Sequence, residues 1–286
     1  MRLIQPIFAG VETKDTGLGK NNKIYNAWKE INERVQKDID LGVKEFLLFY
    51  IPEFKLGEKA DTWRQGEGID EHKFDQVCVT AASLSTLPIK LNVDVCLCAY
   101  TKDGHCCITN DQERTDQLLL EQAKAIYTAS GATIAPSDCQ LNTVKNIKNI
   151  KDGNIPVMSY STKFRSTFYG GWRNVMGIEK GIERPYQLDV SSRADAIQRS
   201  IDYANDGADE LMVKPGMTSI DLIRDIKNAT NKPCGVFQTS GEYLGIGAPG
   251  SLLETYKIFK RAGADYMISY GARDLCYLKV SKGDIK

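Results

Sequence analysis

The sequence predicts an α/β protein that folds as a single (β/α)8 barrel, or TIM barrel. Three observations support this fold class: eight short apolar segments rich in β-branched residues, amphipathic segments of helical period between most of them, and a glycine motif that recurs where a helix gives way to a strand. Strands that alternate with helices pair in parallel. Eight such units in 286 residues fit a closed barrel better than an open sheet. An open doubly wound sheet is the alternative, but no G-x-G-x-x-G turn follows an early strand.

The predicted strands are the short apolar segments, and the predicted helices are the amphipathic segments between them. In chain order the strands are Leu3–Phe8, Glu45–Phe49, Lys90–Cys96, Thr133–Ala135, Val157–Tyr160, Glu210–Val213, Gly235–Gln238 and Tyr266–Tyr270. The helices are Tyr25–Leu41, Asp70–Leu84, Asp116–Ser130, Arg193–Asn205, Ser219–Asn228 and Leu252–Arg261. Each helix returns the chain to the start of the next strand, as a parallel barrel requires.

A glycine stands between a helix and a strand at four points of the chain. These are Leu41-Gly42-Val43, Ser130-Gly131-Ala132, Asp206-Gly207-Ala208 and Ala262-Gly263-Ala264. Glycine readily adopts the left-handed conformation that ends a helix, so each glycine is expected to turn the chain into the next strand. Four uses of one connection indicate one repeating unit. No linker or charge block interrupts the chain, so we expect one domain over residues 1–286.

The composition favours a cytoplasmic enzyme that acts on a small molecule. Hydrophobic residues make up 42% and charged residues 26%, as in globular proteins, and 37 basic residues balance 37 acidic ones. This balance gives no reason to expect a nucleic-acid or acidic-membrane partner. No apolar run approaches the roughly 20 residues of a membrane helix, and the N-terminus does not have the form of a signal peptide. The eight cysteines are therefore expected to be free, buried or metal-bound.

Two lysines follow neighbouring predicted strands, at the barrel end where active sites lie. Lys214 comes directly after the predicted strand Glu210–Val213 and precedes a proline. Lys163 follows the preceding predicted strand, Val157–Tyr160. Each could simply extend its charged end to solvent. Adjacent strands lie about 4.8 Å apart, however, so the two amines could share one site. Because like charges and burial both disfavour the ammonium form, at least one amine should be neutral near pH 7, which favours Schiff-base chemistry.

Three cysteines lie close together after the third predicted strand. Cys96 and Cys98 are two residues apart, and Cys106 can return to them across a short loop that contains Gly104. Three thiolates with a fourth, open position make a catalytic zinc site. Three buried thiols are the alternative, since free cysteine is often buried, and the spacing alone does not decide. The remaining scattered cysteines, Cys78, Cys139, Cys234 and Cys276, are interpreted as core residues.

Together these segments resemble the porphobilinogen synthase, or 5-aminolevulinate dehydratase, family. The family motifs D-V-C-L-C-x-Y-T-x-x-G-H-C, S-Y-S-x-K-F/Y-A-S-x-F-Y-G and M-V-K-P correspond to Asp94–Cys106, Ser159–Gly170 and Met212–Pro215. Shorter matches are Ala135–Asp138, Tyr186-Gln187, Ser240–Tyr243 and Arg261–Asp265. The resemblance runs from about Leu3 to Asp274 and implies the (β/α)8 fold.

The resemblance implies the condensation of two molecules of 5-aminolevulinate to porphobilinogen, with loss of two waters, in tetrapyrrole biosynthesis. Lys214 corresponds to the lysine that forms the Schiff base with the substrate that becomes the propionate side. Lys163 corresponds to the second lysine, which engages the substrate that becomes the acetate side. The three cysteines correspond to ligands of Zn²⁺, which would polarise an oxygen of the second substrate. Asp94 and Ser137 correspond to polar active-site groups, and Asp94 is either a proton-transfer group or a simple counter-charge.

The resemblance also implies groups that bind the substrate carboxylates and cover the site. Ser240 and Tyr270 correspond to the donors for the first substrate. Arg173, Gln187 and the additional Arg184 correspond to donors for the second, since a guanidinium holds a carboxylate through two hydrogen bonds. The aromatic residues Tyr169 and Trp172 correspond to a cover, with Tyr169–Gln187 as the mobile lid; surface packing is the alternative for Trp172.

Several positions depart from the family pattern. The family sequence A-P-S-D-M-M-D-G-R is replaced by Ala135–Thr143, Arg165 replaces a small residue, Lys102-Asp103 replaces Ser-His, and the lid and the stretch after Tyr243 are shorter. These changes favour a paralogue that uses the same double-lysine, zinc-assisted chemistry on another amino-ketone in specialised metabolism. The retained lysines, thiols and carboxylate donors favour the family reaction itself. A catalytically inactive barrel is the least favoured alternative.

The chain begins at the first predicted strand, without the N-terminal arm through which family members embrace a partner. A smaller contact between subunits disfavours large rings. We therefore expect a homodimer, rather than an octamer, with a monomer as the alternative.

Overall fold

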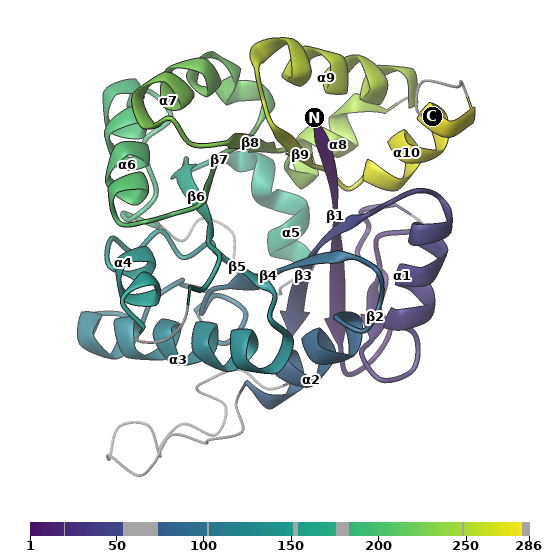
Figure 1. Cartoon of the computed structure of the whole chain (residues 1–286), viewed down its shortest axis with the longest axis horizontal. Coiled ribbons are helices and arrows are strands. Elements are labelled where there is room, and N and C mark those ends of the chain that lie inside the picture. The colour runs from purple at the N-terminus through teal and green to yellow at the C-terminus, as the bar shows by residue number, and fades with distance from the viewer. Residues whose placement is uncertain are drawn as a thin grey trace.

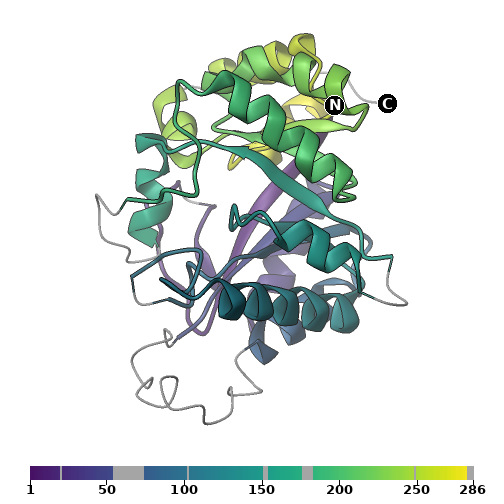
Figure 2. The same cartoon turned by 90° about the vertical axis from the view of Figure 1, so that its left-hand side faces the viewer.

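Across the described residues, eight parallel strands stand side by side as a barrel with helices on its outside (Figures 1 and 2). The structure is a computed structural model that describes residues 1–19, 21–53, 74–101, 103–150, 154–175, 183–247 and 249–281. The strands are β1 (Arg2–Gly10), β3 (Glu45–Ile51), β4 (Lys90–Val95), β5 (Thr133–Pro136), β6 (Met158–Lys163), β7 (Glu210–Lys214), β8 (Cys234–Phe237) and β9 (Tyr266–Ile268). All eight predicted strands are present.

The strands pair in the order β5-β4-β3-β1-β9-β8-β7-β6, so the first strand lies between the two halves of the barrel. The ends of this row meet where Ile134 of β5 forms a parallel bridge with Val157, just before β6. The amide of Ile134 donates to the Pro156 carbonyl there, at 2.9 Å. This contact makes the sheet a nearly closed barrel and confirms the predicted fold class over the open sheet. That residues 1–286 form one domain stays a prediction.

The outer helices follow the strands in the expected alternation. They are α1 (Ile31–Asp40), α2 (Asp75–Leu84), α3 (Gln112–Ser130), α4 (Thr143–Lys148), α6 (Arg193–Asn205), α7 (Ile223–Thr230), α9 (Pro249–Ala262) and α10 (Ala272–Ser281). Short helical segments follow β6, β7 and β8 at the carboxyl end of the barrel: η1 (Thr167–Tyr169), α5 (Gly170–Val175), η2 (Met217–Leu222) and α8 (Ser240–Ile246). In Figure 1, α5 lies inside the ring of outer helices.

The helix predictions hold for most of the long segments, but the first fails at one end, the helix predicted over Ser219–Asn228 begins as the 3-10 segment η2, and α10 was not predicted. Arg193–Asn205 is helical with the predicted bounds, and the four connecting glycines all have positive φ, between 65° and 101°. The predicted helix Tyr25–Leu41 is wrong in its first part, because Ile24–Asn26 forms a short strand, β2, paired with the end of β1. The helix there begins at Ile31. Part of the predicted helix Asp70–Leu84 lies outside the described residues.

The core has two layers, one inside the barrel and one between the strands and the helices. Side chains that alternate along the strands fill the inside, among them Phe8, Tyr160, Met212, Phe237 and Tyr266. The residues between them pack outward against the helices. Among the described residues no helix has both the length and the apolar character needed to cross a membrane.

We expect Gly235→Ala to destabilise the protein by about 3 kcal/mol, because overpacking a filled barrel interior forces neighbouring groups apart. A Cβ on Gly235 would overlap the buried ring of Tyr266, whose hydroxyl donates to the Leu211 carbonyl at 2.6 Å. Gly245→Ala is the matched control: no atom lies within 4 Å of its added Cβ, and the change should alter stability by less than about 1 kcal/mol. Chemical denaturation of both variants tests this, and equal stabilities would contradict it.

Candidate active site

Side chains from four successive strands meet in one cavity at the carboxyl end of the barrel. Asp94 comes from β4, Ser137 follows β5, Lys163 ends β6 and Lys214 ends β7. Parallel strands end on the same side of a barrel, so residues far apart in the sequence converge there. The cavity, called the lysine cavity below, is lined by Phe49, Asp94, Cys98, Gly104, Cys106, Ser137, Lys163, Tyr169, Arg173, Arg184, Gln187 and Lys214.

The two lysines lie in register on neighbouring strands. Lys163 of β6 is the pairing partner of Lys214 of β7, and each is 8% exposed. The Lys214 Nζ lies 3.8 Å from the centre of the Phe237 ring, 5.2 Å from that of Tyr160 and 5.4 Å from that of Tyr169. These aromatic rings exclude water from the amine on several sides.

The electrostatics separate the two amines. Burial, and then the positive charge of Lys163, lower the pKa of Lys214 to about 7. Burial also acts to lower the pKa of Lys163, but the negative charges of nearby thiols, first Cys139 and then Cys106, raise it well above its ordinary value. The Lys163 amine donates to the Ser137 carbonyl as well. Lys214 is therefore the amine with a large neutral fraction near pH 7, as the sequence predicted for one of the pair.

Asp94 faces the lysines from β4. Burial raises the pKa of Asp94 to about 6, against the hydrogen bond from Ser137 and the charges of the two lysines, which lower it. Its Oδ1 is buried and has no hydrogen-bond partner among the described residues. A buried carboxyl oxygen without a partner is costly unless something else binds it, so this atom is available to a substrate.

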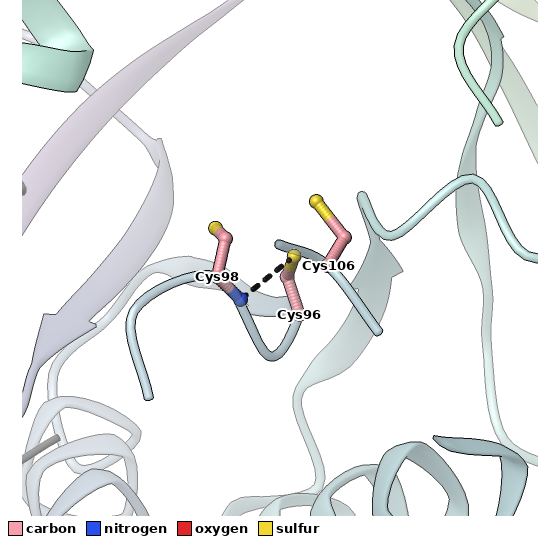
Figure 3. Close-up of side chains that lie close together, drawn as sticks. All are labelled: Cys96, Cys98 and Cys106. Atoms are coloured by element: carbon pink, nitrogen blue, oxygen red, sulfur yellow. Dashed lines mark hydrogen bonds between the residues drawn. The ribbon is translucent and has the colours of Figure 1, made fainter. Parts of the chain in front are cut away.

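Three sulfur atoms gather beside the lysine cavity (Figure 3). The Sγ atoms of Cys96, Cys98 and Cys106 all lie within 4.8 Å of one another, and the amide of Cys98 donates to Cys96 Sγ at 3.4 Å. Hydrogen bonds from the other two thiols hold the pKa of Cys106 well below its usual value. Among the described residues this is the one group of three such side chains able to hold a metal ion. The spacing and the all-sulfur donor set fit a metal that prefers thiolate ligands.

The segment before α6 holds the loop that carries Cys106. The Cys106 amide donates to the Tyr186 hydroxyl at 2.9 Å, and Arg184 donates to the Gly104 carbonyl at 3.1 Å. The Tyr186 carbonyl in turn accepts from Arg199 of α6 at 2.7 Å. In the sequence, Tyr186 was noted only as part of a motif match. Its hydrogen bond with Cys106 joins residues 80 positions apart.

The carboxylate donors expected from the sequence fall into two groups. Arg173, Arg184 and Gln187 line the lysine cavity, and the buried Oε1 of Gln187 has no partner among the described residues. Ser240 and Tyr270 are buried but are absent from its wall.

Helix α5 and the preceding η1 segment cover Ser240. Ser240 donates to the Phe168 carbonyl at 3.3 Å, and a Cβ on Gly171 would lie 3.0 Å from its side chain. Tyr169 lines the cavity and donates to the Phe164 and Lys214 carbonyls, at 2.7 and 3.2 Å. Trp172 lies in α5, but its side chain and residues 176–182 of the predicted lid lie outside the described part of the chain.

Three buried residues of the site were not predicted as site residues. Tyr160 and Phe237 form part of the aromatic wall around Lys214. Glu242 of α8 accepts hydrogen bonds from the amides of Gly216 and Met217, so it anchors the segment that follows Lys214. Tyr160 stands inside the S-Y-S-x-K motif and Glu242 inside Ser240–Tyr243, so the sequence marked both positions without indicating their contacts.

The chain was compared with families of known proteins. A family model described as delta-aminolevulinic acid dehydratase matches residues 1–278. The chain belongs to this family. A delta-aminolevulinic acid dehydratase of Bacillus subtilis (strain 168) is 31% identical over 95% of this chain and 88% of its own length. One of Escherichia coli (strain K12) is 32% identical over 88% of this chain and 82% of its own.

A solved structure gives the same result for the fold. The delta-aminolevulinic acid dehydratase (porphobilinogen synthase) of Toxoplasma gondii ME49, in complex with the reaction product porphobilinogen, superposes with a TM-score of 0.85. It is 26% identical in sequence, and the match covers 99% of this chain and 86% of that one. These comparisons confirm three predictions: membership of the porphobilinogen synthase family, the family reaction, and the enzyme class of hydro-lyase. Nothing in them supports the alternative of a paralogue with another substrate.

We expect the pH at which Lys214 becomes reactive to rise when Lys163 loses its charge. The ammonium of Lys163 disfavours a second positive charge on Lys214, so Lys163→Met removes a cause that lowers the pKa of Lys214. Adduct formation at Lys214 with an amino-ketone and cyanoborohydride should then begin at higher pH than in the native protein. Both proteins are measured at the same pH values, so the pH dependence of the reagent itself affects them equally. Lys29→Met, which changes an exposed lysine, is the control. Identical pH profiles of the native protein and Lys163→Met would show that the charge of Lys163 does not affect the pKa of Lys214.

Proposed function

We propose that this chain performs the family reaction with Lys214 and Lys163 as its two Schiff-base lysines. Two molecules of 5-aminolevulinate are condensed to porphobilinogen, with loss of two waters. The observation that carries this assignment is the pairing of two buried lysines in register in one cavity, one of them with its pKa lowered to about 7. A neutral amine can attack a ketone carbon, whereas an ammonium cannot.

The chemistry balances with one amine for each substrate. Each lysine nitrogen bonds to the ketone carbon of one substrate, and the ketone oxygen leaves as water, which accounts for both waters lost. The carbon next to one iminium loses a proton and bonds to the iminium carbon of the other substrate, from which that lysine is then eliminated. The free amino group of one substrate displaces the remaining lysine. Loss of a final proton gives the aromatic pyrrole, and both lysines return as amines.

Lys214 reacts first in this proposal, because it has the larger neutral fraction. The aromatic wall of Tyr160, Tyr169 and Phe237 keeps its amine desolvated. Lys163 keeps its proton to higher pH, because it lies near Cys106, the thiol with a lowered pKa. It can therefore orient the first substrate as a cation before it reacts with the second.

Asp94 and Ser137 are proposed to serve the proton transfers. Asp94 has an unpartnered Oδ1 beside both amines, and its pKa of about 6 allows it to accept and return a proton near neutral pH. Ser137 hydrogen-bonds the same carboxyl and keeps it oriented. A role for Asp94 as counter-charge alone is the alternative, and it predicts that Asp94→Asn retains proton transfer.

The substrate carboxylates are proposed to bind on two sides of the lysine cavity. Arg173, Arg184 and Gln187 line it and would hold the second substrate. Ser240 and Tyr270 would hold the first once the η1 and α5 segments move off Ser240, since Ser240 now donates to the Phe168 carbonyl. Tyr169 and Trp172 belong to the moving segments and would close over the substrates.

Cys96, Cys98 and Cys106 are proposed to hold Zn²⁺, which is the preferred metal for three thiolates. When bound there it would polarise an oxygen of the second substrate. Tyr186 and Arg184 keep the Cys106 loop in place for this role. A homodimer and a cytoplasmic location are proposed on the sequence argument alone.

Borohydride trapping with 5-aminolevulinate should add mass to the peptide that contains Lys214. Lys214→Ala should lose both this adduct and turnover, because it removes the buried amine whose pKa is lowered to about 7. Lys163→Ala should lose turnover while it still forms the first adduct. Lys29→Ala, an exposed lysine, should behave as the native protein. Adduct confined to surface lysines would overturn the assignment.

Metal analysis of the purified protein should find about one zinc per chain. Cys106→Ser should lose the metal, because it removes the thiol with the lowest pKa of the three. Cys78→Ser, on α2 outside the cluster, should retain it. Full activity in strong chelator with magnesium alone would contradict a zinc site.

A further inference from the structure

The position of Lys163 depends on an irregularity in β6. Along this strand Met158 and Tyr160 point into the barrel, and strict alternation would send residue 162 inward and Lys163 outward. The pairing with β7 shows that this does not happen. Ser159 pairs with Leu211 and Thr162 pairs with Val213, so two residues of β6 face one residue of β7.

This is a β-bulge, and it changes the face on which the following residues lie. Thr162 now pairs with Val213, which packs outward, and Lys163 pairs with Lys214, which points inward. Without the extra residue, Thr162 would pair with Lys214 and occupy the inward position. The bulge is therefore the reason that both lysines reach one cavity.

A buried group of hydroxyls on the outer side of β6 holds the bulge. Ser200 of α6 is fully buried; it donates to the Ser161 hydroxyl at 3.0 Å and lies 2.9 Å from the Thr162 hydroxyl. Ser161 reaches the Met212 carbonyl at 3.4 Å, and Thr162 donates to the Ala196 carbonyl of α6 at 3.1 Å. Two consecutive strand residues thus turn their hydroxyls to the same helix residue, which a regular strand does not allow.

We propose that Ser200 is a positioning residue for the reaction, because its hydrogen bonds to Ser161 and Thr162 hold the bulge that turns Lys163 into the cavity beside Lys214. This inference rests on the proposed function of the two lysines. Ser200 lies on an outer helix and does not line the lysine cavity, so it acts only through β6. Loss of its hydroxyl removes one hydrogen bond from each of the Ser161 and Thr162 hydroxyls, which weakens the hold of α6 on the bulge and allows β6 to slip to regular alternation.

The test uses Ser200→Ala in the full-length protein, with the borohydride adducts at Lys163 and Lys214 measured separately by peptide mass. The adduct at Lys214 should stay within about twofold of native, while the adduct at Lys163 and kcat should both fall about tenfold. Thr162→Val, which removes the partner hydroxyl with little change of shape, should give the same pattern and carries the test if Ser200→Ala does not fold. When Ser200→Ala and Thr162→Val are combined, their effects on the Lys163 adduct and on kcat should not add, because both changes break the same hydrogen-bond network.

Thr255→Ala is the matched control, because Thr255 is also a buried helix hydroxyl but donates to the Ser251 carbonyl of its own helix α9. It should leave the ratio of the two adducts unchanged. An unchanged ratio in both Ser200→Ala and Thr162→Val, whatever happens to thermal stability, would overturn the inference while the proposed function stands. The same shift of ratio in Thr255→Ala would also overturn it. A native protein with no adduct at either lysine would overturn the proposed function and this inference together.

Discussion

Two buried amines side by side are the constraint on which the rest of this site depends. Lys163 and Lys214 are paired in register at the ends of β6 and β7, and water is largely excluded from both. Two ammonium groups cannot both be stable in such a place, so one must lose its proton or gain a negative neighbour. The surroundings do both: aromatic rings enclose Lys214, and the thiol of Cys106, whose pKa is lowered, lies near Lys163. The proposed reactivity of the site follows from this difference between the two amines.

The outer shell of the barrel keeps this unfavourable arrangement in place. The Ser200 hydroxyl of α6 contacts the bulge of β6, and Glu242 of α8 binds the amides that follow Lys214. Tyr186, before α6, binds the amide of Cys106. Each of these groups binds the backbone next to a residue of the proposed site, so the proposed catalytic groups are positioned by contacts behind them. The stability of the fold is thereby coupled to the geometry of the chemistry.

Short segments at the carboxyl end of the barrel cover part of this site. Helix α5 packs over Ser240, and neither this residue nor Tyr270 lines the lysine cavity. Arg173 lies on the same helix and does line the cavity, with its guanidinium 5.5 Å from the centre of the Tyr169 ring. One movement of η1 and α5 would therefore change the exposure of Ser240 and Arg173, which belong to the two sets of residues proposed to bind the substrate carboxylates. Loops at this end of a barrel can move in this way because the strands beneath them remain rigid.

The sequence by itself predicted the eight strands, the glycines that end four helices and, through its motifs, the family reaction. These features are encoded locally: periodicity, a left-handed turn residue and contiguous motifs need only a few neighbouring residues. The strand β2 and the helices α4, α5, α8 and α10 were not predicted. The first four have only three to seven residues, which carry too little periodicity and take their form from tertiary contacts. Only the tertiary structure decided that Lys163 points inward, that α5 covers Ser240 and that the two lysine pKa values differ in direction. Each of these depends on register, packing or burial between segments far apart in the chain, and no local pattern records them.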